Sequence, residues 1–194
     1  MSHSQNLEEQ LLLEIAARLK DPGFVLDIGA NDGVTLSNTR ALIERGWTGC
    51  FVEPDYEAFG KLLALYGKTP GMILVNAAID IEASLVKFRK SDAGGLVSTI
   101  CDTAWKDHVL DEYWVPTVTP RQLVDLMPRG PDIISIDIEG RSFEVLSRLP
   151  FGSWDVKAVC VEHDGRAIEI SAWANGRGFR VHELNAENIL CVRR

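Results

Sequence analysis

The sequence predicts an α/β fold, a doubly wound and mostly parallel seven-stranded sheet that ends in a C-terminal antiparallel hairpin. Apolar β-type runs alternate with segments of helical periodicity along the 194 residues, as expected for a parallel sheet covered by helices on both faces. The last two predicted strands, residues 179–184 and 189–193, are separated only by residues 185–188. Because so short a connection cannot form a crossover, it predicts a hairpin.

The first half of the chain alternates helices and strands in a regular way. Apolar residues such as Leu12, Ile15 and Leu19 recur at helical spacing, and Gly46 and Gly67 stand where helices are expected to end. The predicted elements are a helix over residues 6–20, a strand over 24–28, a helix over 34–45, a strand over 48–52 and a helix that follows Pro54.

The second half contains a long connection between two strands. The predicted elements are a strand over 72–79, a helix that starts at Thr119-Pro120, strands over 133–137 and 156–162, and a helix over 167–175. The connection 80–118 contains a short β element over 84–89 and the residues Trp105 and Trp114. Since connections of this length are usually functional, we expect it to cover a ligand. Alternatively, the tryptophans cover the edge of the sheet.

Length and composition predict one soluble domain over residues 1–194. At 46% hydrophobic residues the chain can bury a single substantial core, and no segment resembles a linker between two domains. No apolar run approaches the ~20 residues of a membrane span, and residues 1–4 lack a hydrophobic signal core, so we expect a cytoplasmic protein. The four cysteines, Cys50, Cys101, Cys160 and Cys191, form no C-x-x-C pair, so neither disulfides nor a zinc site is expected.

The charge of the chain disfavours nucleic acid as a partner. The formal net charge is −8, and no cluster of Lys and Arg interleaved with aromatic residues appears. Because nucleic-acid binding depends on neutralising phosphates, the charge favours a small or neutral molecule as the acceptor. We therefore expect neither nucleic acid nor a membrane among the partners. The sequence does not indicate an oligomeric state.

The turn after the first strand, Asp27-Ile-Gly-Ala-Asn-Asp-Gly33, indicates the type of ligand. A dinucleotide-binding turn has the spacing G-x-G-x-x-G and holds a pyrophosphate on a helix N-terminus. This turn instead separates Gly29 and Gly33 by three residues and includes Asp32, which would repel phosphate. Glu53 ends the second strand, where nucleotide-binding folds place an acid on ribose hydroxyls. The pattern favours a cationic ligand with a ribose over a nicotinamide cofactor, although the glycines could simply form a tight turn.

A second group of polar residues follows the fourth and fifth predicted strands. Ser135-Ile-Asp-Ile-Glu-Gly140 places Asp137 at the end of one strand and Glu139 just beyond it, and Val161-Glu-His-Asp164 ends the neighbouring strand. Ligands of open α/β sheets bind at the carboxyl ends of the strands, near the point where the strand order reverses. We therefore expect both groups to line one site.

These motifs resemble the FkbM-like family of class I methyltransferases that use S-adenosyl-L-methionine. The resemblance covers residues 24–164 and depends on the segments 27–33, 51–54, 75–79, 119–123 and 136–140. It implies a Rossmann-like sheet of strand order 3-2-1-4-5-7-6 and O-methylation of a hydroxyl on a sugar or other small metabolite. We therefore expect a single methyltransferase domain over residues 1–194, in which the long connection 80–118 binds the acceptor. The alternative is a domain that binds the methyl donor without catalysis.

The resemblance and the residue types together predict the site residues. The expected catalytic residues are His163, Asp137 and Glu139, with His163 favoured because its usual pKa is near neutrality. His163 could equally be hydrogen-bonded within the framework at the strand end. A divalent metal held by Asp137, Glu162 and His163 is an alternative. The expected cofactor-binding residues are Asp27, Gly29, Ala30, Asn31, Gly33, Glu53, Pro54, Asn76, Ala77 and Asp137, of which Asn76 could instead cap a strand.

Overall fold

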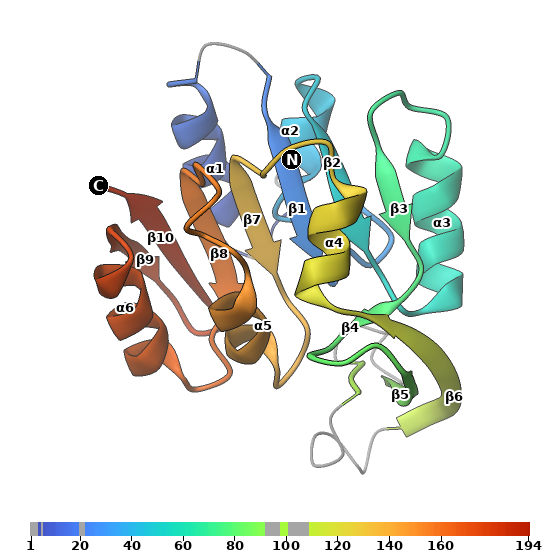
Figure 1. The fold of residues 1–194 in the computed structure, drawn as a ribbon. Helices are drawn as coiled ribbons and strands as arrows, with labels where there is room; N and C mark the ends of the chain where they lie inside the picture. Colours follow the sequence, from blue (N-terminus) through green and yellow to red (C-terminus); the bar gives the residue numbers. More distant parts are fainter. Residues whose placement is uncertain (1–3, 5, 20–21, 92–97, 101–108) are drawn as a thin grey trace.

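The computed structural model contains a seven-stranded sheet with helices on both faces and a smaller three-stranded sheet (Figure 1). It describes residues 4, 6–19, 22–91, 98–100 and 109–194. The strands of the large sheet are β1 (Phe24–Ile28), β2 (Thr48–Val52), β3 (Ile73–Val75), β7 (Ile133–Ile136), β8 (Ala158–Glu162), β9 (Phe179–Leu184) and β10 (Asn188–Arg193). Their order is β3-β2-β1-β7-β8-β10-β9, and β10 runs antiparallel to both neighbours. The predicted fold class, including the closing hairpin, is confirmed.

Helices cover both faces of the large sheet (Figure 1). They are α1 (Glu8–Ala16), α2 (Arg40–Glu44), α3 (Tyr56–Tyr66), α4 (Pro120–Leu126), α5 (Ser142–Arg148) and α6 (Ala167–Gly176). One face packs against α4, α5 and α6, and the other packs against α1, α2 and α3. Because both faces are buried, the central strands read as nearly continuous apolar runs, which is why the sequence predicted them well.

The small sheet lies beyond the carboxyl ends of β1 and β2 (Figure 1). It contains β4 (Ala78–Ile79), β5 (Leu85–Ser91) and β6 (Val109–Val118) in the order β4-β6-β5. The prediction of one strand over 72–79 was wrong, because the chain leaves the large sheet after Val75. There the Asn76 amide donates to the carbonyls of Glu53 and Pro54 at 2.8 and 3.3 Å and turns the chain. The predicted β element 84–89 corresponds to β5, whereas β6 was not predicted.

The predicted helix 34–45 was wrong over its first half, since α2 begins only at Arg40. The Asp32 carboxylate accepts hydrogen bonds from the backbone N–H groups two and three residues further along, at 2.9 and 2.7 Å. Ser37 Oγ accepts from the N–H groups at the start of α2 at 3.3 and 3.1 Å, and between them Leu36 has a φ of 54°. Such side-chain hydrogen bonds compete with helix formation.

Other expectations concern single elements and residues. The N-terminal helix is shorter than predicted and spans Glu8–Ala16. Cys50, Cys160 and Cys191 are buried in strands as expected, whereas Cys101, Trp105 and His108 lie outside the described residues. Among the helices that the structure describes, none combines the length and apolarity that a bilayer crossing requires.

Candidate active site

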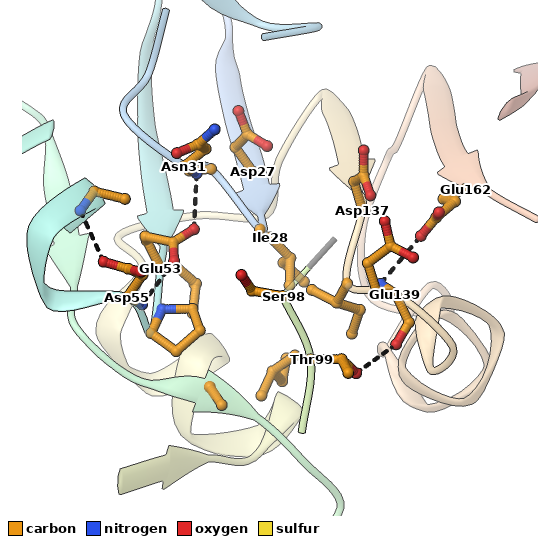
Figure 2. Close-up of a pocket in the computed structure, with 18 of the residues that line it drawn as sticks. Asp27, Ile28, Asn31, Glu53, Asp55, Ser98, Thr99, Asp137, Glu139 and Glu162 are labelled. Carbon is orange, nitrogen blue, oxygen red and sulfur yellow. Dashed lines mark hydrogen bonds between the residues drawn. The ribbon is translucent and has the colours of Figure 1, made fainter. Parts of the chain in front are cut away.

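A cavity of about 690 Å³ lies at the carboxyl ends of β1, β2 and β7. This volume falls within the ≈ 300–1,000 Å³ that is usual for small-molecule sites. The predicted residues that line it are Asp27, Gly29, Ala30, Asn31, Glu53, Pro54, Ala77, Asp137 and Glu139. Figure 2 shows Asp27, Asn31 and Glu53 on one side of the cavity and Asp137, Glu139 and Glu162 on the other. The two polar groups that the sequence suggested therefore share one site.

Gly29 allows the ends of β1 and β7 to approach each other closely. Its φ is 82°, and an added Cβ would lie 1.8 Å from the carbonyl oxygen of Asp137. A side chain at this position is excluded both by the backbone conformation and by the contact. Gly33, by contrast, does not line the cavity: its φ is 76°, and an added Cβ would meet Leu62 Cδ1 at 2.7 Å. Its role is to pack the turn against α3.

The Glu53 carboxylate is held by two backbone N–H groups. Oε2 accepts from Asn31 at 2.8 Å and Oε1 accepts from Asp55 at 2.7 Å (Figure 2). The residue is 6% exposed, and this burial raises its pKa to about 7 despite the two hydrogen bonds. A carboxylate has about four lone-pair sites, so acceptor capacity remains on the cavity side. The group can accept from two vicinal hydroxyls.

Asp27 is buried beside the same cavity. Its carboxylate accepts a hydrogen bond from Thr39 Oγ1 at 2.5 Å. Burial raises its pKa to about 7, and the negative charge of Asp137 contributes in the same direction. No Lys, Arg or His in the described ranges forms an ion pair with it. A cationic ligand would stabilise the ionised form of this carboxyl group.

Three carboxyl groups meet on the other side of the cavity. Oxygen atoms of Asp137, Glu139 and Glu162 all lie within 4.8 Å of one another. Burial raises the pKa of both Asp137 and Glu162, and repulsion by neighbouring acids adds to the rise for Glu162. Ionised carboxyl groups this close repel one another, so the cluster favours retaining a proton.

The loop after β7 holds Glu139 in an uncommon backbone conformation. Glu139 has a φ of 37°, its N–H donates to Glu162 Oε2 at 3.1 Å, and its carbonyl accepts from Thr99 Oγ1 at 2.8 Å. Left-handed non-glycine residues are often retained at ligand sites, where surrounding contacts fix them. Here the fixed loop directs Glu139 toward Asp137 (Figure 2).

The described part of the excursion 80–118 lies along the cavity. Phe88 and Lys90 of β5 line it, as do residues 98–100, which pair with β5 through Arg89 and Thr99. Arg141 joins this region to the loop after β7, because its guanidinium binds Asp80 through two hydrogen bonds of 2.7 and 3.2 Å. Trp114, in contrast, is 66% exposed and does not line the cavity.

Two further predicted residues lie outside the cavity lining. His163 Nδ1 accepts from Gly165 N–H at 3.1 Å and Nε2 donates to the Asn185 carbonyl at 3.2 Å, so both ring nitrogens serve the local framework. Asn76 is exposed and fixes the chain at the end of β3, as a capping residue would. The geometry therefore supports neither residue in contact with a ligand.

Sequence reasoning missed several cavity residues. Asn38, Ser135 and Glu187 line the cavity, and Asp55 forms an ion pair of 2.9 Å with Lys90 beside it. The polar run Ser37-Asn38-Thr39 could have indicated the first of these, because it interrupts the apolar spacing of the expected helix. Glu187 follows from no local pattern, since the hairpin turn brings it to the cavity.

The arrangement can now be compared with known proteins. The sequence matches the Methyltransferase FkbM domain over residues 27–185. The chain belongs to the FkbM methyltransferase family. The match includes both polar groups of the cavity, and it confirms the resemblance inferred from the motifs. A comparison with curated proteins gives no match.

Solved structures of other methyltransferases have a similar fold. A putative RNA methyltransferase from Pyrococcus horikoshii is 14% identical with a TM-score of 0.52, covering 96% of this chain and 83% of that one. Precorrin-6y C5,15-methyltransferase from Geobacter metallireducens GS-15 is 12% identical with a TM-score of 0.54, covering 96% and 87%. TrmK from M. capricolum, in complex with S-adenosyl-homocysteine, is 8% identical with a TM-score of 0.51, covering 94% and 66%. At these identities the likeness shows the fold alone.

Membership of the family implies S-adenosyl-L-methionine as the cofactor, and the described cavity residues suit it. Its ribose needs acceptors for two hydroxyls, and Glu53 retains capacity for both. Its sulfonium and amino groups are positively charged, and the wall beside Gly29 contains the buried acid Asp27. The cavity residues thus match the donor in hydrogen bonding and in sign of charge.

Proposed function

We propose that this protein transfers the methyl group of S-adenosyl-L-methionine to a hydroxyl oxygen of a small metabolite or sugar. One observation carries the proposal. The same cavity contains a preorganised carboxylate at Glu53 and, apart from it, a pair of carboxyl groups at Asp137 and Glu139. The first suits the nucleoside of the donor, and the second suits an acceptor hydroxyl.

The first carboxylate fixes the donor in the cavity. Glu53 accepts the two ribose hydroxyls, and each hydrogen bond to a charged acceptor contributes roughly 1.5–3 kcal/mol. Pro54 and Ala77, which also line the cavity, flank the adenine, while Gly29 and Asp27 lie at the methionine end. When bound, the donor supplies a methyl group on a positively charged sulfur, which leaves as a neutral thioether.

The second group acts on the acceptor. Asp137 accepts the proton of the hydroxyl as the new oxygen–carbon bond forms and the sulfur–carbon bond breaks. Glu139 accepts a hydrogen bond that aligns the hydroxyl, and alignment of reacting groups can provide ~7–11 kcal/mol of the barrier. A general base typically adds ~10²- to 10⁴-fold. Orientation is therefore the larger contribution, and the base assists it.

The acceptor is proposed to be small and not a nucleic acid. The far side of the cavity is bordered by Asp137, Glu139, Glu162 and Glu187, and the chain carries a formal charge of −8. Carboxylates accept hydrogen bonds from hydroxyls but repel phosphates. The excursion 80–118 supplies the rest of this side, and we propose it as the acceptor-binding part of a single domain.

A metal-assisted route is the alternative use of the same carboxyl groups. Asp137 and Glu162 lie close enough to ligate one divalent cation together with Glu139, whereas His163, which the sequence suggested as the third ligand, does not belong to this group. Dialysis of the active protein against a chelator separates the two routes. Turnover that survives dialysis supports proton transfer to Asp137, whereas turnover that is lost and returns with added Mg²⁺ supports the metal.

The direct test is to incubate the purified protein with methyl-labelled S-adenosyl-L-methionine and a metabolite extract. We expect mass spectrometry to find the label on the oxygen of a hydroxylated small molecule. Label on RNA, on a protein or on nitrogen would contradict the proposed acceptor. Binding of the donor without any labelled product, across extracts that contain sugars and other hydroxylated metabolites, would favour a non-catalytic binding domain.

A further inference from the structure

Lys90 of β5 forms a largely buried ion pair with Asp55 at the border of the cavity. Its Nζ lies 2.9 Å from Asp55 Oδ2, and the two side chains are 15% and 6% exposed. The same ammonium group pairs with Glu57 and lies 5.8 Å from the centre of the Tyr56 ring. Because an exposed lysine side chain is usually free to change rotamer, this many partners shows that the ammonium group is held at Asp55.

Asp55 is in turn bonded directly to Glu53. Its backbone N–H donates to Glu53 Oε1 at 2.7 Å (Figure 2). Its Oδ1 caps α3 by accepting from the N–H groups of Glu57 and Ala58 at 2.7 and 3.1 Å. The other oxygen, Oδ2, is the one that Lys90 binds. Asp55 therefore connects three parts of the molecule, namely the proposed ribose acceptor, the start of α3 and the small sheet.

The charge of Asp55 affects the ionisation of Glu53. The two buried acids are separated only by Pro54, so a charge on one opposes a charge on the other. Although burial opposes ionisation, hydrogen bonds from Lys90 and from N–H groups of α3 lower the pKa of Asp55, which is therefore charged at neutral pH. Burial raises the pKa of Glu53, and the charge of Asp55 adds to the rise. The ammonium group of Lys90 offsets this repulsion.

The surroundings of Glu53 contain few other positive charges. Among the residues that the structure describes, Lys90 is the one cation that forms an ion pair with Asp55. The remaining charged and titratable groups near Glu53 or along this side of the cavity are Asp27 of β1, Glu57 and Lys61 of α3, and Tyr113 of β6. Of these, only Lys61 is a cation, and it is exposed.

Resting on the donor assignment of the proposed function, we propose that Lys90 is a positioning residue for donor binding. By pairing with Asp55, it keeps the neighbouring Glu53 carboxylate ionised and in place to accept the ribose hydroxyls. Lys90 belongs to the long connection 80–118, which is proposed to bind the acceptor. The same connection thereby also supports the nucleoside end of the cavity.

The pH dependence of nucleoside binding tests the proposal. Calorimetry measures the affinity for 5′-methylthioadenosine, which has the ribose but lacks the amino-acid part, between about pH 5.5 and 9. Affinity for the wild type should rise with pH as Glu53 ionises. Lys90→Met removes the offsetting charge, so the midpoint of this rise should move up by at least about half a pH unit. At the plateau above the midpoint, the affinity should stay within about threefold of the wild type.

Asp55→Asn should shift the midpoint in the opposite direction. Asparagine caps helices as well as aspartate does, so the start of α3 is retained. The variant removes the negative charge beside Glu53, and the midpoint should therefore move down by at least about half a pH unit. Damage to the fold would not produce shifts of opposite sign from the two partners of one ion pair.

Two lysine variants serve as controls. Lys90→Arg keeps the positive charge and should keep the wild-type midpoint. Lys87→Met removes the other lysine–glutamate pair of β5, in which Nζ lies 3.2 Å from Glu112, and should leave the midpoint unchanged. If Lys90→Met instead lowered the affinity by the same factor at every pH, its role would be structural and the proposal would be overturned.

The variant Asp55→Asn decides the matter alone if Lys90→Met fails to fold, because an unshifted or raised midpoint in it refutes the proposal. Wild-type binding of methylthioadenosine that does not change with pH would also refute the role of Lys90, while the donor assignment would stand. If the wild type binds neither methylthioadenosine nor S-adenosylhomocysteine at any pH, the proposed function fails as well.

Discussion

The two ends of the cavity differ in how the chain builds them. At the proposed donor end, Glu53 is held by backbone N–H groups of the adjacent turns after β1 and β2. At the proposed acceptor end, the loop of Glu139, whose φ is 37°, is held by the side chains of Glu162 and Thr99, and residues 98–100 reach the cavity beside β5. Backbone groups fix the first end and side chains from distant segments fix the second. The first therefore suits a ligand shared by many enzymes, and the second can vary with the acceptor.

The largest effect is expected at the donor end, from Gly29→Ala. The added Cβ would overlap the Asp137 carbonyl at 1.8 Å, so β1 and β7 could not close and measurable binding of S-adenosylhomocysteine should be lost. Gly60→Ala is the matched control, because an added Cβ there meets nothing within 4 Å. Calorimetry measures the affinity of both variants for S-adenosylhomocysteine. Binding of the ligand to Gly29→Ala with wild-type affinity would contradict the account.

At the acceptor end, Asp137→Asn should separate turnover from binding. Loss of the proposed base is expected to lower turnover by ~10²- to 10⁴-fold. Binding of S-adenosylhomocysteine should change by less than about threefold, since the ribose contacts of Glu53 remain. Transfer of labelled methyl groups measures turnover, and calorimetry measures the binding of S-adenosylhomocysteine. Asp155→Asn, an 83% exposed acid, is the control. Unchanged turnover in Asp137→Asn would remove this residue from the mechanism.

Glu53→Ala should show the opposite separation, with weaker binding of the donor. Loss of charged hydrogen bonds to the ribose is expected to weaken binding of S-adenosylhomocysteine at least about tenfold. Glu14→Ala, on the exposed face of α1, provides the matched control. If Glu53→Ala weakened the binding of S-adenosylhomocysteine by less than about threefold, the ribose would have to bind elsewhere.

The donor end should also respond to pH. Asp27 and Glu53 have pKa values of about 7, and the proposed donor favours their ionised forms. Affinity should therefore rise about tenfold per group between pH 6 and 8 and level off above. Calorimetry in two buffers of different ionisation enthalpy should detect proton release below pH 7. If the affinity for S-adenosylhomocysteine did not depend on pH, these carboxyl groups would not contact the ligand.

The same pKa shifts affect the stability of the ligand-free protein. Both values lie above the usual 3.8 and 4.5, so the folded state holds protons that the unfolded state has lost. This contribution is fully present below about pH 4 and disappears as the pH rises through about 7. Bound donor favours the ionised forms of both carboxyl groups. The rise in melting temperature on adding S-adenosylhomocysteine, measured by thermal unfolding, should therefore be larger at pH 8 than at pH 6.

The smallest effect is expected from His163→Gln. Both ring nitrogens bind backbone groups of Gly165 and Asn185, and the ring does not line the cavity. Turnover of labelled donor should change by less than about threefold. A loss of ~10²-fold or more would restore His163 as the general base and displace Asp137.

The sequence predicted the large sheet because burial on both faces leaves a clear apolar pattern. Phe24–Ile28 and Thr48–Val52 were predicted with the observed bounds. The prediction of a helix over 34–45 was wrong in its first half because the side chains of Asp32 and Ser37 accept hydrogen bonds from nearby backbone N–H groups. An apolar pattern does not show such bonds. The division of strand 72–79 depends on Asn76, which bonds to the chain beyond β2.

The site was predictable where its residues are close in the sequence. The turn from Asp27 to Gly33 and the acid at Glu53 belong to consecutive elements, so spacing alone related them. His163 lies outside the cavity lining, and the Asn185 carbonyl that its ring binds comes from a distant hairpin, which sequence spacing does not show. Glu187 was missed for the same reason, since only the folded chain brings it to the cavity.

The central claim is that the cavity binds a sulfonium nucleoside and not a diphosphate. Calorimetric titration of the wild-type protein with S-adenosylhomocysteine, and separately with a nicotinamide dinucleotide, tests it most directly. The account predicts binding of the first in the micromolar range and no detectable binding of the second. Absence of S-adenosylhomocysteine binding, or preferential binding of the dinucleotide, would contradict the claim.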